Sequence, residues 1–191
     1  MKSYNLLFAG VGGQGVLLAS EVISALAMNR GWDVKKSEIH GMAQRGGSVV
    51  SHVRISETQV FSPTIPLGEA THLVSFEELE TLRYLDHMSP QGLVIMNLQR
   101  VNPMTVLAGA AEYPTNASEL IRERLRLIEV KGVELAQKAG NPRAVNTVLL
   151  GVLSKDLPFE EEEWIDTFKQ VVPPKILEIN LKAFRLGREA G

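Results

Sequence analysis

The chain has 191 residues, of which 45% are hydrophobic, so it is long enough for one domain with a real core. Twenty basic and 22 acidic residues leave a net charge of −2, which argues against a nucleic-acid backbone or an anionic membrane as partner. There is no cysteine, which excludes disulfides, a cysteine nucleophile, and cysteine-ligated zinc or iron–sulfur clusters.

Apolar periodicity predicts strands and helices that alternate along most of the chain. The strands are predicted at residues 4–9, 33–37, 48–55, 71–76, 93–97 and 125–130. The helices are predicted at residues 14–28, 77–86, 117–124, 133–139 and 146–154. Such alternation is typical of the α/β class, so we expect a Rossmann-like, mostly parallel sheet flanked by helices.

The last part of the chain shows helical patterns only. Four acidic residues at 160–163 mark the first turn of one helix, where the helix dipole favours them. The paired prolines at 173–174 separate this helix from a last one at 175–188. The apolar surface of that last helix is wide, which predicts that it docks on the domain or on another chain.

The length and the absence of internal repeats predict one domain over residues 1–191, with an α/β core at 1–157 and C-terminal helices at 158–191. An uncharged stretch at 3–20 superficially resembles a signal sequence, but four glycines interrupt it. We interpret it instead as a strand, a loop and the start of a helix. We therefore expect a soluble cytoplasmic protein with no membrane partner.

The first motif, Gly10-Val11-Gly12-Gly13-Gln14-Gly15, matches G-x-G-x-x-G between a predicted strand and a predicted helix. Glycines permit a tight turn and let a ligand approach the backbone, while the helix N-terminus offers free N–H groups to an anion such as a phosphate. The candidate binding residues are Gly10, Gly12, Gly13, Gln14 and Gly15. The alternative is that these glycines only allow the strand to pack closely on the helix.

Two specific nucleotide sites make further demands on the sequence. A nicotinamide site needs an acid at the end of the second strand, and Glu38 is near that place, although its segment is not a clean apolar strand. An ATP-binding P-loop needs Lys and Ser or Thr after its last glycine. This chain has Val16 and Leu17 there, which excludes a P-loop.

The second motif is the polar, glycine-punctuated segment 37–48, which we expect in a loop after a strand. Ligand sites of parallel α/β sheets lie at such loops. Arg45 offers a planar fork for a phosphate or carboxylate, His40 titrates near neutrality, and Gln44 both donates and accepts hydrogen bonds. Gly46 and Gly47 complete the candidate set. The alternative is a solvated loop with one structural arginine.

Other candidate groups are weaker. The four histidines, His40, His52, His72 and His87, show no metal-ligand spacing, so we interpret each as a satisfied or surface residue. No G-x-S-x-G motif supports a hydrolase serine. The acidic cluster at 77–80 is interpreted as the solvated face of a helix.

Several segments carry a resemblance to a known family. They are residues 10–15, Glu38-Ile-His-Gly-Met-Ala-Gln-Arg-Gly-Gly-Ser48, Ser51-His-Val-Arg54, 146–151 and Glu178-Ile-Asn-Leu-Lys-Ala-Phe184. They resemble the gamma-type domain of 2-oxoacid:ferredoxin oxidoreductases over nearly the whole chain. The segment 40–54 is most similar to the beta (small) subunits of indolepyruvate ferredoxin oxidoreductases.

The resemblance implies oxidative decarboxylation of a 2-oxoacid, here an aryl pyruvate, to an acyl-coenzyme A and CO2 with reduction of ferredoxin. Such enzymes use thiamine diphosphate, Mg²⁺ and [4Fe–4S] clusters. This chain has no cysteine and lacks the Gly-Asp-Gly…Asn-Asn pattern that holds thiamine diphosphate through a metal. The resemblance therefore implies that this chain binds none of these cofactors alone. A larger partner subunit would carry them, in an obligate heteromer of α2β2 type that also meets ferredoxin.

The resemblance also implies roles for the two motifs, because this domain lies against the thiamine-binding domains in the family. We expect the glycine turn and the His40–Gly47 loop to face the partner. Arg45 would neutralise a substrate carboxylate or a coenzyme A phosphate, and His40 and Gln44 would position the bound intermediate. Two alternatives stay open: a free-standing Rossmann-type dinucleotide-binding protein, and a purely structural subunit.

Overall fold

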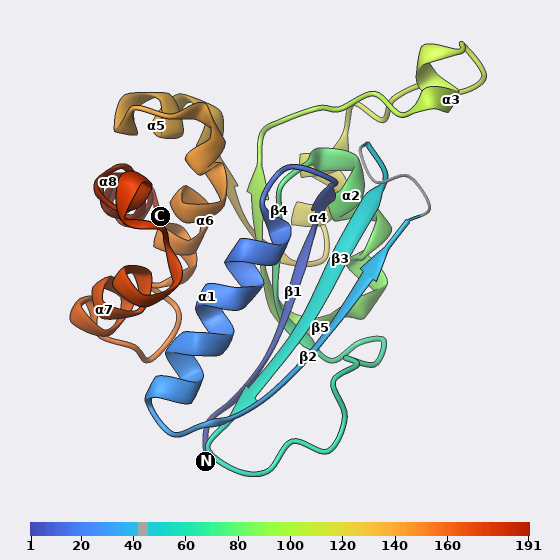
Figure 1. Cartoon of the computed structure of the whole chain (residues 1–191). Coiled ribbons are helices and arrows are strands. Elements are labelled where there is room, and N and C mark those ends of the chain that lie inside the picture. Colours follow the sequence, from blue (N-terminus) through green and yellow to red (C-terminus); the bar gives the residue numbers. More distant parts are fainter. Residues whose placement is uncertain (42–45) are drawn as a thin grey trace.

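The computed structural model describes residues 1–41 and 46–191, and these form one twisted sheet with helices on both faces (Figure 1). The strands are β1 (Ser3–Val11), β2 (Asp33–His40), β3 (Ser48–Ser56), β4 (Ala70–Ser75), β5 (Met88–Asn97) and β6 (Arg126–Val130). The α-helices are α1 (Val16–Asn29), α2 (Glu78–Arg83), α3 (Met104–Leu107), α4 (Ala117–Arg122), α5 (Gly132–Ala139), α6 (Val145–Leu153), α7 (Glu161–Val171) and α8 (Pro174–Ala190). Two single turns of 3₁₀-helix are η1 (Leu85–His87) and η2 (Pro142–Ala144).

The order of strands in the described sheet is β2-β3-β1-β4-β5-β6. β1, β4, β5 and β6 pair in parallel, whereas β3 runs antiparallel to both of its neighbours. The expectation of an α/β fold with a mostly parallel sheet is confirmed. The exception has a simple cause, because the segment between β2 and β3 is too short for the crossover that parallel neighbours require.

The central strands β1, β4 and β5 are buried on both faces over most of their length, which explains why β1 has a continuous apolar run. Leu6 and Phe8 point into a core shared with α1, α6, α7 and α8, while Leu7 and Ala9 point into a smaller core that Ile121 of α4 closes. In Figure 1 the first group of helices lies on one side of the sheet, and α2 and α4 lie on the other. Most of the strand predicted at 48–55 is covered likewise, so that even the polar His52 is buried, while Ser48 and Arg54 are half-buried.

The C-terminal helices close one side of the molecule. α7 begins with a capping box between Glu160 and Glu163, and the acids of its first turn stand where the dipole favours them. α8 packs against α6 and α5, and Phe184 of α8 joins Trp164 and Phe168 of α7 in an aromatic cluster. The last helix is predicted to dock either on the domain or on another chain. In the described structure it docks on the domain. In the described residues no helix combines the length and hydropathy needed to cross a bilayer.

Candidate functional site

The glycine motif forms the turn from β1 to α1, at the carboxyl edge of the parallel strands. Gly13 and Gly15 have φ angles of 100° and 89°, which L side chains rarely adopt. The Gln14 side chain holds the turn in place. Its Oε1 accepts the Val11 N–H at 2.7 Å, and its Nε2 donates to the carbonyl of Phe76 and to Gln99 Oε1, each at 3.2 Å. The turn is thus tied to the ends of β4 and β5.

Glycine is required at different positions of the turn for different physical reasons. A Cβ on Gly10 would lie 2.9 Å from Val16 and from Phe76, and one on Gly15 would lie 3.0 Å from Asn146 Nδ2. Close packing therefore accounts for glycine at these two positions, against the strand–helix contact at Gly10 and against α6 at Gly15. A Cβ on Gly13 would meet nothing within 4 Å, so its backbone borders open space that a ligand or a partner can approach.

The N-terminus of α1 carries no capping side chain. Gly15 occupies the N-cap position, and the first turn has no acidic residue. The first backbone bond of the helix runs from Ala19 to Gly15, which leaves the N–H groups of residues 16–18 without an acceptor among the described residues. Such an end favours a negative or strongly accepting group.

The structure brings the two predicted motifs together. Gly12 N donates to the Gly47 carbonyl at 2.9 Å, and Val11 pairs with Ser48 at the start of β3. His40 ends β2 with half of its side chain exposed, and its Nε2 lies 3.8 Å from Glu38 Oε2. The candidates Gln44 and Arg45 belong to segment 42–45, outside the described residues.

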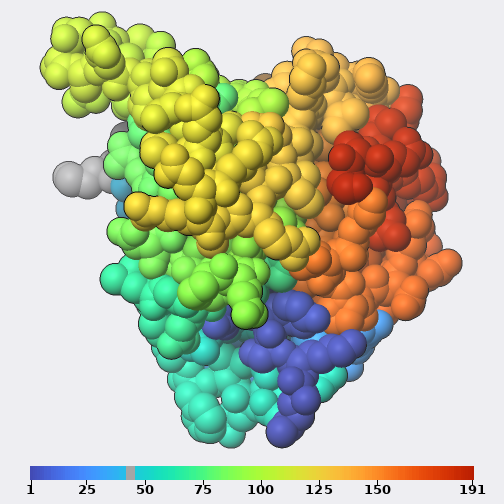
Figure 2. Space-filling view, turned by 180° about the vertical axis from the view of Figure 1, so that it is seen from behind, coloured from blue at the N-terminus to red at the C-terminus, as the bar shows by residue number. Residues whose placement is uncertain are grey.

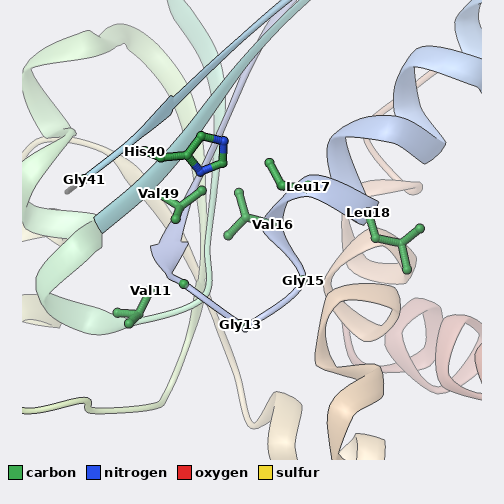
Figure 3. Close-up of a pocket in the computed structure, with 10 residues that line it drawn as sticks. Val11, Gly13, Gly15, Val16, Leu17, Leu18, His40, Gly41 and Val49 are labelled. Atoms are coloured by element: carbon green, nitrogen blue, oxygen red, sulfur yellow. The ribbon is translucent and has the colours of Figure 1, made fainter. Parts of the chain in front are cut away.

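A cavity of about 530 Å³ lies between the turn and the ends of β2 and β3. Its lining is mostly apolar, and His40 supplies the only titratable side chain among the described residues there (Figure 3). The lining residues are Val11, Gly12, Gly13, Gly15, Val16, Leu17, Leu18, His40, Gly41 and Val49. Figure 3 shows Val16, Leu17 and Val49 grouped near the His40 ring. This cavity suits an uncharged group, with an imidazole and backbone N–H groups at its border.

A second hollow, of about 230 Å³, lies on the other side of the turn. Gly13 and Gln14 line it together with Gln99, Val133, and the Pro142–Val145 region, from which Arg143 supplies a positive charge. Sequence analysis did not single out Arg143. No local pattern indicated it, because η2 reaches the glycine turn only through the tertiary fold.

The acidic cluster at 77–80 is not a solvated helix face, and that interpretation is wrong. Glu77, Glu78 and Glu80 are only 1%, 8% and 5% exposed. Glu77 is the N-cap of α2 and accepts the Glu80 N–H at 2.8 Å. Glu80 accepts the Ser48 hydroxyl and lies 3.1 Å from the Arg83 guanidinium. Burial raises the pKa of Glu80, an effect that Ser48 and Arg83 oppose.

The histidines are mostly held in place as expected, with one exception. His52 Nδ1 accepts the Ile65 N–H at 3.2 Å, and His72 Nε2 lies 2.8 Å from Asp156 Oδ2. Burial lowers the pKa of both His52 and His72. The exception is His87, whose Nδ1 is buried with no hydrogen-bond partner among the described residues. Residues 1–41 and 46–191 contain no group of three or more His, Asp or Glu placed to hold a metal.

The topology also bears on the nicotinamide alternative. In a dinucleotide-binding fold the second strand lies beside the first, so that its terminal acid reaches the ribose. Here β3 separates β2 from β1, and Glu38 pairs with Ser51. The Glu38 carboxylate lies 3.0 Å from Lys36 Nζ. Glu38 is thus engaged at the edge of the sheet, away from the expected ribose position.

Comparisons with known proteins agree with this architecture. The family described as pyruvate ferredoxin/flavodoxin oxidoreductase matches residues 5–190. The chain is 38% identical over 196 residues to the indolepyruvate oxidoreductase subunit IorB of Thermococcus kodakarensis, covering 100% of this chain and 96% of that one. It is 28% identical to the ketoisovalerate oxidoreductase subunit VorA of Methanothermobacter marburgensis, where 98% of this chain matches only 36% of the longer relative.

A solved structure shows the same fold. The gamma subunit of a keto/oxoacid ferredoxin oxidoreductase from Geobacter sulfurreducens superposes with a TM-score of 0.72 at 23% identity, covering 98% of this chain and 97% of that one. The family match and the full-length relative together decide the assignment. The chain belongs to the pyruvate ferredoxin/flavodoxin oxidoreductase family.

Proposed function

We propose that the chain is the small subunit, without clusters, of an indolepyruvate-type 2-oxoacid:ferredoxin oxidoreductase. The observation that carries the proposal is the full-length similarity to IorB. The reaction converts an aryl pyruvate and coenzyme A into an aryl-acetyl-coenzyme A and CO2, with release of one proton, and two electrons pass to ferredoxin.

The residues of this chain do not suit the cofactors of that reaction. Iron–sulfur clusters need thiolate ligands, and the sequence contains no cysteine. The described residues include no acidic or histidine group suited to a metal, and the sequence lacks the motif that holds thiamine diphosphate. We therefore assign the thiamine diphosphate, Mg²⁺ and [4Fe–4S] clusters to a larger partner subunit. The path of the electrons to ferredoxin would then also lie in that subunit.

The contribution of this chain is a shaped, water-excluding wall for the partner's active site. The apolar cavity beside Val16 and Val49 would cover an uncharged part of the substrate or of coenzyme A. The N–H groups at the start of α1 and the positive charge of Arg143 would attract an anionic part on the other side of the turn. Arg45 remains the proposed partner of a carboxylate or phosphate, and His40 and Gln44 remain the proposed positioning residues.

The substrate test uses the complex purified without oxygen after co-expression of this chain with the larger subunit. We expect dye reduction that depends on both coenzyme A and a 2-oxoacid, and that is fastest with indolepyruvate in a panel with phenylpyruvate, pyruvate and 2-oxoglutarate. A preference for 2-oxoglutarate or pyruvate would contradict the aryl assignment. A chain that never associates with a larger subunit would contradict the proposal as a whole.

The site test compares two arginine variants in the same complex. Arg45→Ala should lower kcat/KM about 100-fold, because a charge-assisted contact to substrate or coenzyme A is worth roughly 2–3 kcal/mol. The matched control is Arg124→Ala, an exposed arginine before β6 at the opposite edge of the sheet, which should leave the kinetics unchanged. Equal kinetics for both variants would favour the purely structural alternative, and failed assembly of Arg45→Ala would place that residue in the interface.

The dinucleotide alternative makes a separate prediction. A free-standing Rossmann protein would bind NAD or a flavin as an isolated chain. Because β3 separates β2 from β1, we expect titration calorimetry of the isolated chain with NAD and with FAD to show no binding. Saturable binding in the micromolar range would restore that alternative.

A further inference from the structure

An arm leaves the body of the molecule between β5 and α4 and carries the short helix α3. In Figure 1 α3 stands apart from the sheet and the other helices, and Figure 2 shows the same segment rising above the body from behind. The arm starts at Leu98, directly after β5, and so leaves from the same carboxyl edge as the glycine turn. It is the most prominent projection of the described chain.

The outer part of the arm, residues 101–111, is mostly apolar and carries no charge. Residues 101–111 read Val-Asn-Pro-Met-Thr-Val-Leu-Ala-Gly-Ala-Ala, with no acidic or basic residue. Met104 is 76% exposed and Leu107 is 65% exposed. Single exposed apolar residues are ordinary, but an uncharged exposed run on a projection is typical of a surface that another molecule covers.

The base of the arm is fixed by one buried carboxylate. Glu77 Oε1 accepts the Val101 N–H at 3.0 Å and also accepts the Tyr113 hydroxyl. The Tyr113 oxygen in turn accepts the Leu79 N–H at 3.1 Å. Glu77 thus ties both ends of the arm to the start of α2.

A second contact strengthens the base. Arg100 Nε lies 2.9 Å from Glu78 Oε2, and its guanidinium lies 5.5 Å from the centre of the Tyr113 ring. Burial and the neighbouring Glu77 raise the pKa of Tyr113, so its hydroxyl keeps the proton that it donates. An apolar projection held on such a base is ordered before it meets a partner, which lowers the entropic cost of binding.

We infer that residues 101–111 form a docking arm that inserts Met104 and Leu107 into an apolar recess of the larger partner subunit. This inference rests on the proposed function and adds the surface through which that subunit is recognised. It identifies the partner by chemistry, as a protein surface with an uncharged pocket.

Three observations favour the larger partner subunit as the molecule that covers the arm. Gln99, at the start of the arm, accepts a hydrogen bond from Gln14 of the glycine turn, so the arm leaves the body beside the turn that we expect to face the partner. In the relative VorA the matching region makes up 36% of a longer chain, so there it is covalently joined to further polypeptide. The absence of basic residues from 101–111 removes the attraction that anionic lipids would need.

The test measures binding of the purified chain to the purified larger subunit. The variant Met104→Glu with Leu107→Glu should raise Kd at least about 100-fold, since two apolar anchors are lost and two charges face an apolar recess. The matched control is Phe61→Glu with Leu67→Glu, because these residues are 86% and 68% exposed in the loop between β3 and β4 at the opposite edge. The control should stay within about threefold of wild type.

The possible outcomes distinguish a failure of the docking-arm inference from a failure of the proposed function. If the wild type binds, and the arm variant and the control have equal Kd, the docking-arm inference is wrong and the proposed function stands. No binding by the wild type would overturn both. A wild-type chain that forms dimers alone, and loses them in the arm variant, would replace the partner subunit by a second copy. Circular dichroism and urea unfolding of both variants should match the wild type, because the substituted residues are exposed.

A second variant tests the base. Tyr113→Phe removes the hydroxyl that joins the arm to Glu77 and should raise Kd about tenfold, because a looser arm must be ordered on binding. Tyr4→Phe is its control and should leave Kd unchanged, since Tyr4 stacks on Trp32 near the start of β1, at the end of that strand opposite the glycine turn. Unchanged affinity for Tyr113→Phe beside a strong effect of the apolar substitutions would show that the arm docks without being held by Glu77.

Discussion

At the scale of single residues, glycines in the turn meet two different requirements: a positive φ angle and room for a neighbouring side chain. The sequence alone does not show which glycine meets which requirement. Gly15 needs both a positive φ and room for Asn146, whereas Gly13 needs a positive φ only. Gln14 adds a polar clamp that reaches β4 and the segment after β5. The turn is therefore a rigid part of the framework at Gly15 and an open surface at Gly13.

This difference predicts unequal effects of two alanine substitutions. Gly13→Ala should lower the free energy of unfolding by about 1 kcal/mol, the cost of a left-handed alanine. Gly15→Ala should lower it by about 2–3 kcal/mol, because the new Cβ also crowds Asn146. Urea unfolding of the two variants measures the gap. Equal losses would mean that Asn146 moves aside at no cost.

At the scale of elements, the crossing of α6 and α8 holds the C-terminal helix on the domain. Gly151 of α6 and Gly187 of α8 face each other, and a Cβ on either would overlap the backbone of the other helix, at Phe184 O and Val148 O respectively. Thr147 Oγ1 adds a hydrogen bond to Asn180 Oδ1 between the same helices. The two glycines let the two helix backbones come close together. The wide apolar surface of α8 is therefore buried mainly within this chain.

A larger residue at this crossing should separate the helices. Gly187→Ala should lower the free energy of unfolding by about 3 kcal/mol, since rigid backbone rather than a flexible side chain stands in the way. Lys182→Ala, on the exposed side of the same helix, should change it by less than about 0.5 kcal/mol. Thermal and urea unfolding measure both. A Gly187→Ala variant as stable as Lys182→Ala would show that the helices can slide apart freely.

At the scale of the whole molecule, buried titratable groups make stability depend on pH. Burial lowers the pKa of His52 and His72 in the folded chain, so the unfolded chain takes up protons first as the pH falls. Their contribution is complete above about pH 6.5 and is lost as the pH falls towards their folded pKa. Glu80 acts in the opposite sense, because its raised pKa favours the folded chain at lower pH.

The free energy of unfolding should therefore fall by up to about 2 kcal/mol between pH 7.5 and pH 5.5 in the Glu80→Gln background, which removes the opposing carboxyl. Adding His72→Gln should reduce this slope, since one of the two buried imidazoles is gone. Urea unfolding at a series of pH values gives the slope directly. A slope that is flat, or that rises as the pH falls, would contradict the assignment to buried neutral histidines.

The residues show where prediction from sequence stops. The apolar runs of β1, β4 and β5 indicated strands because a strand covered on both faces must be apolar throughout. The acids at 77–80 looked solvated because charge usually means exposure. Their burial depends on an N-cap bond, on Ser48 from β3, and on Tyr113 and Arg100 at the base of the arm, all outside the local pattern.

The sequence by itself determined the α/β alternation, the turn at Gly10–Gly15 and the absence of any thiolate for a cluster, since these depend on local pattern and residue type. Only the tertiary structure decided that β2 and β3 form a hairpin beside β1, that Gly12 meets Gly47, and that an apolar arm projects next to them. The physical reason is that sheet order and hydrogen bonds between distant segments depend on how the whole chain closes its core, and periodicity within one segment carries no information about its neighbours.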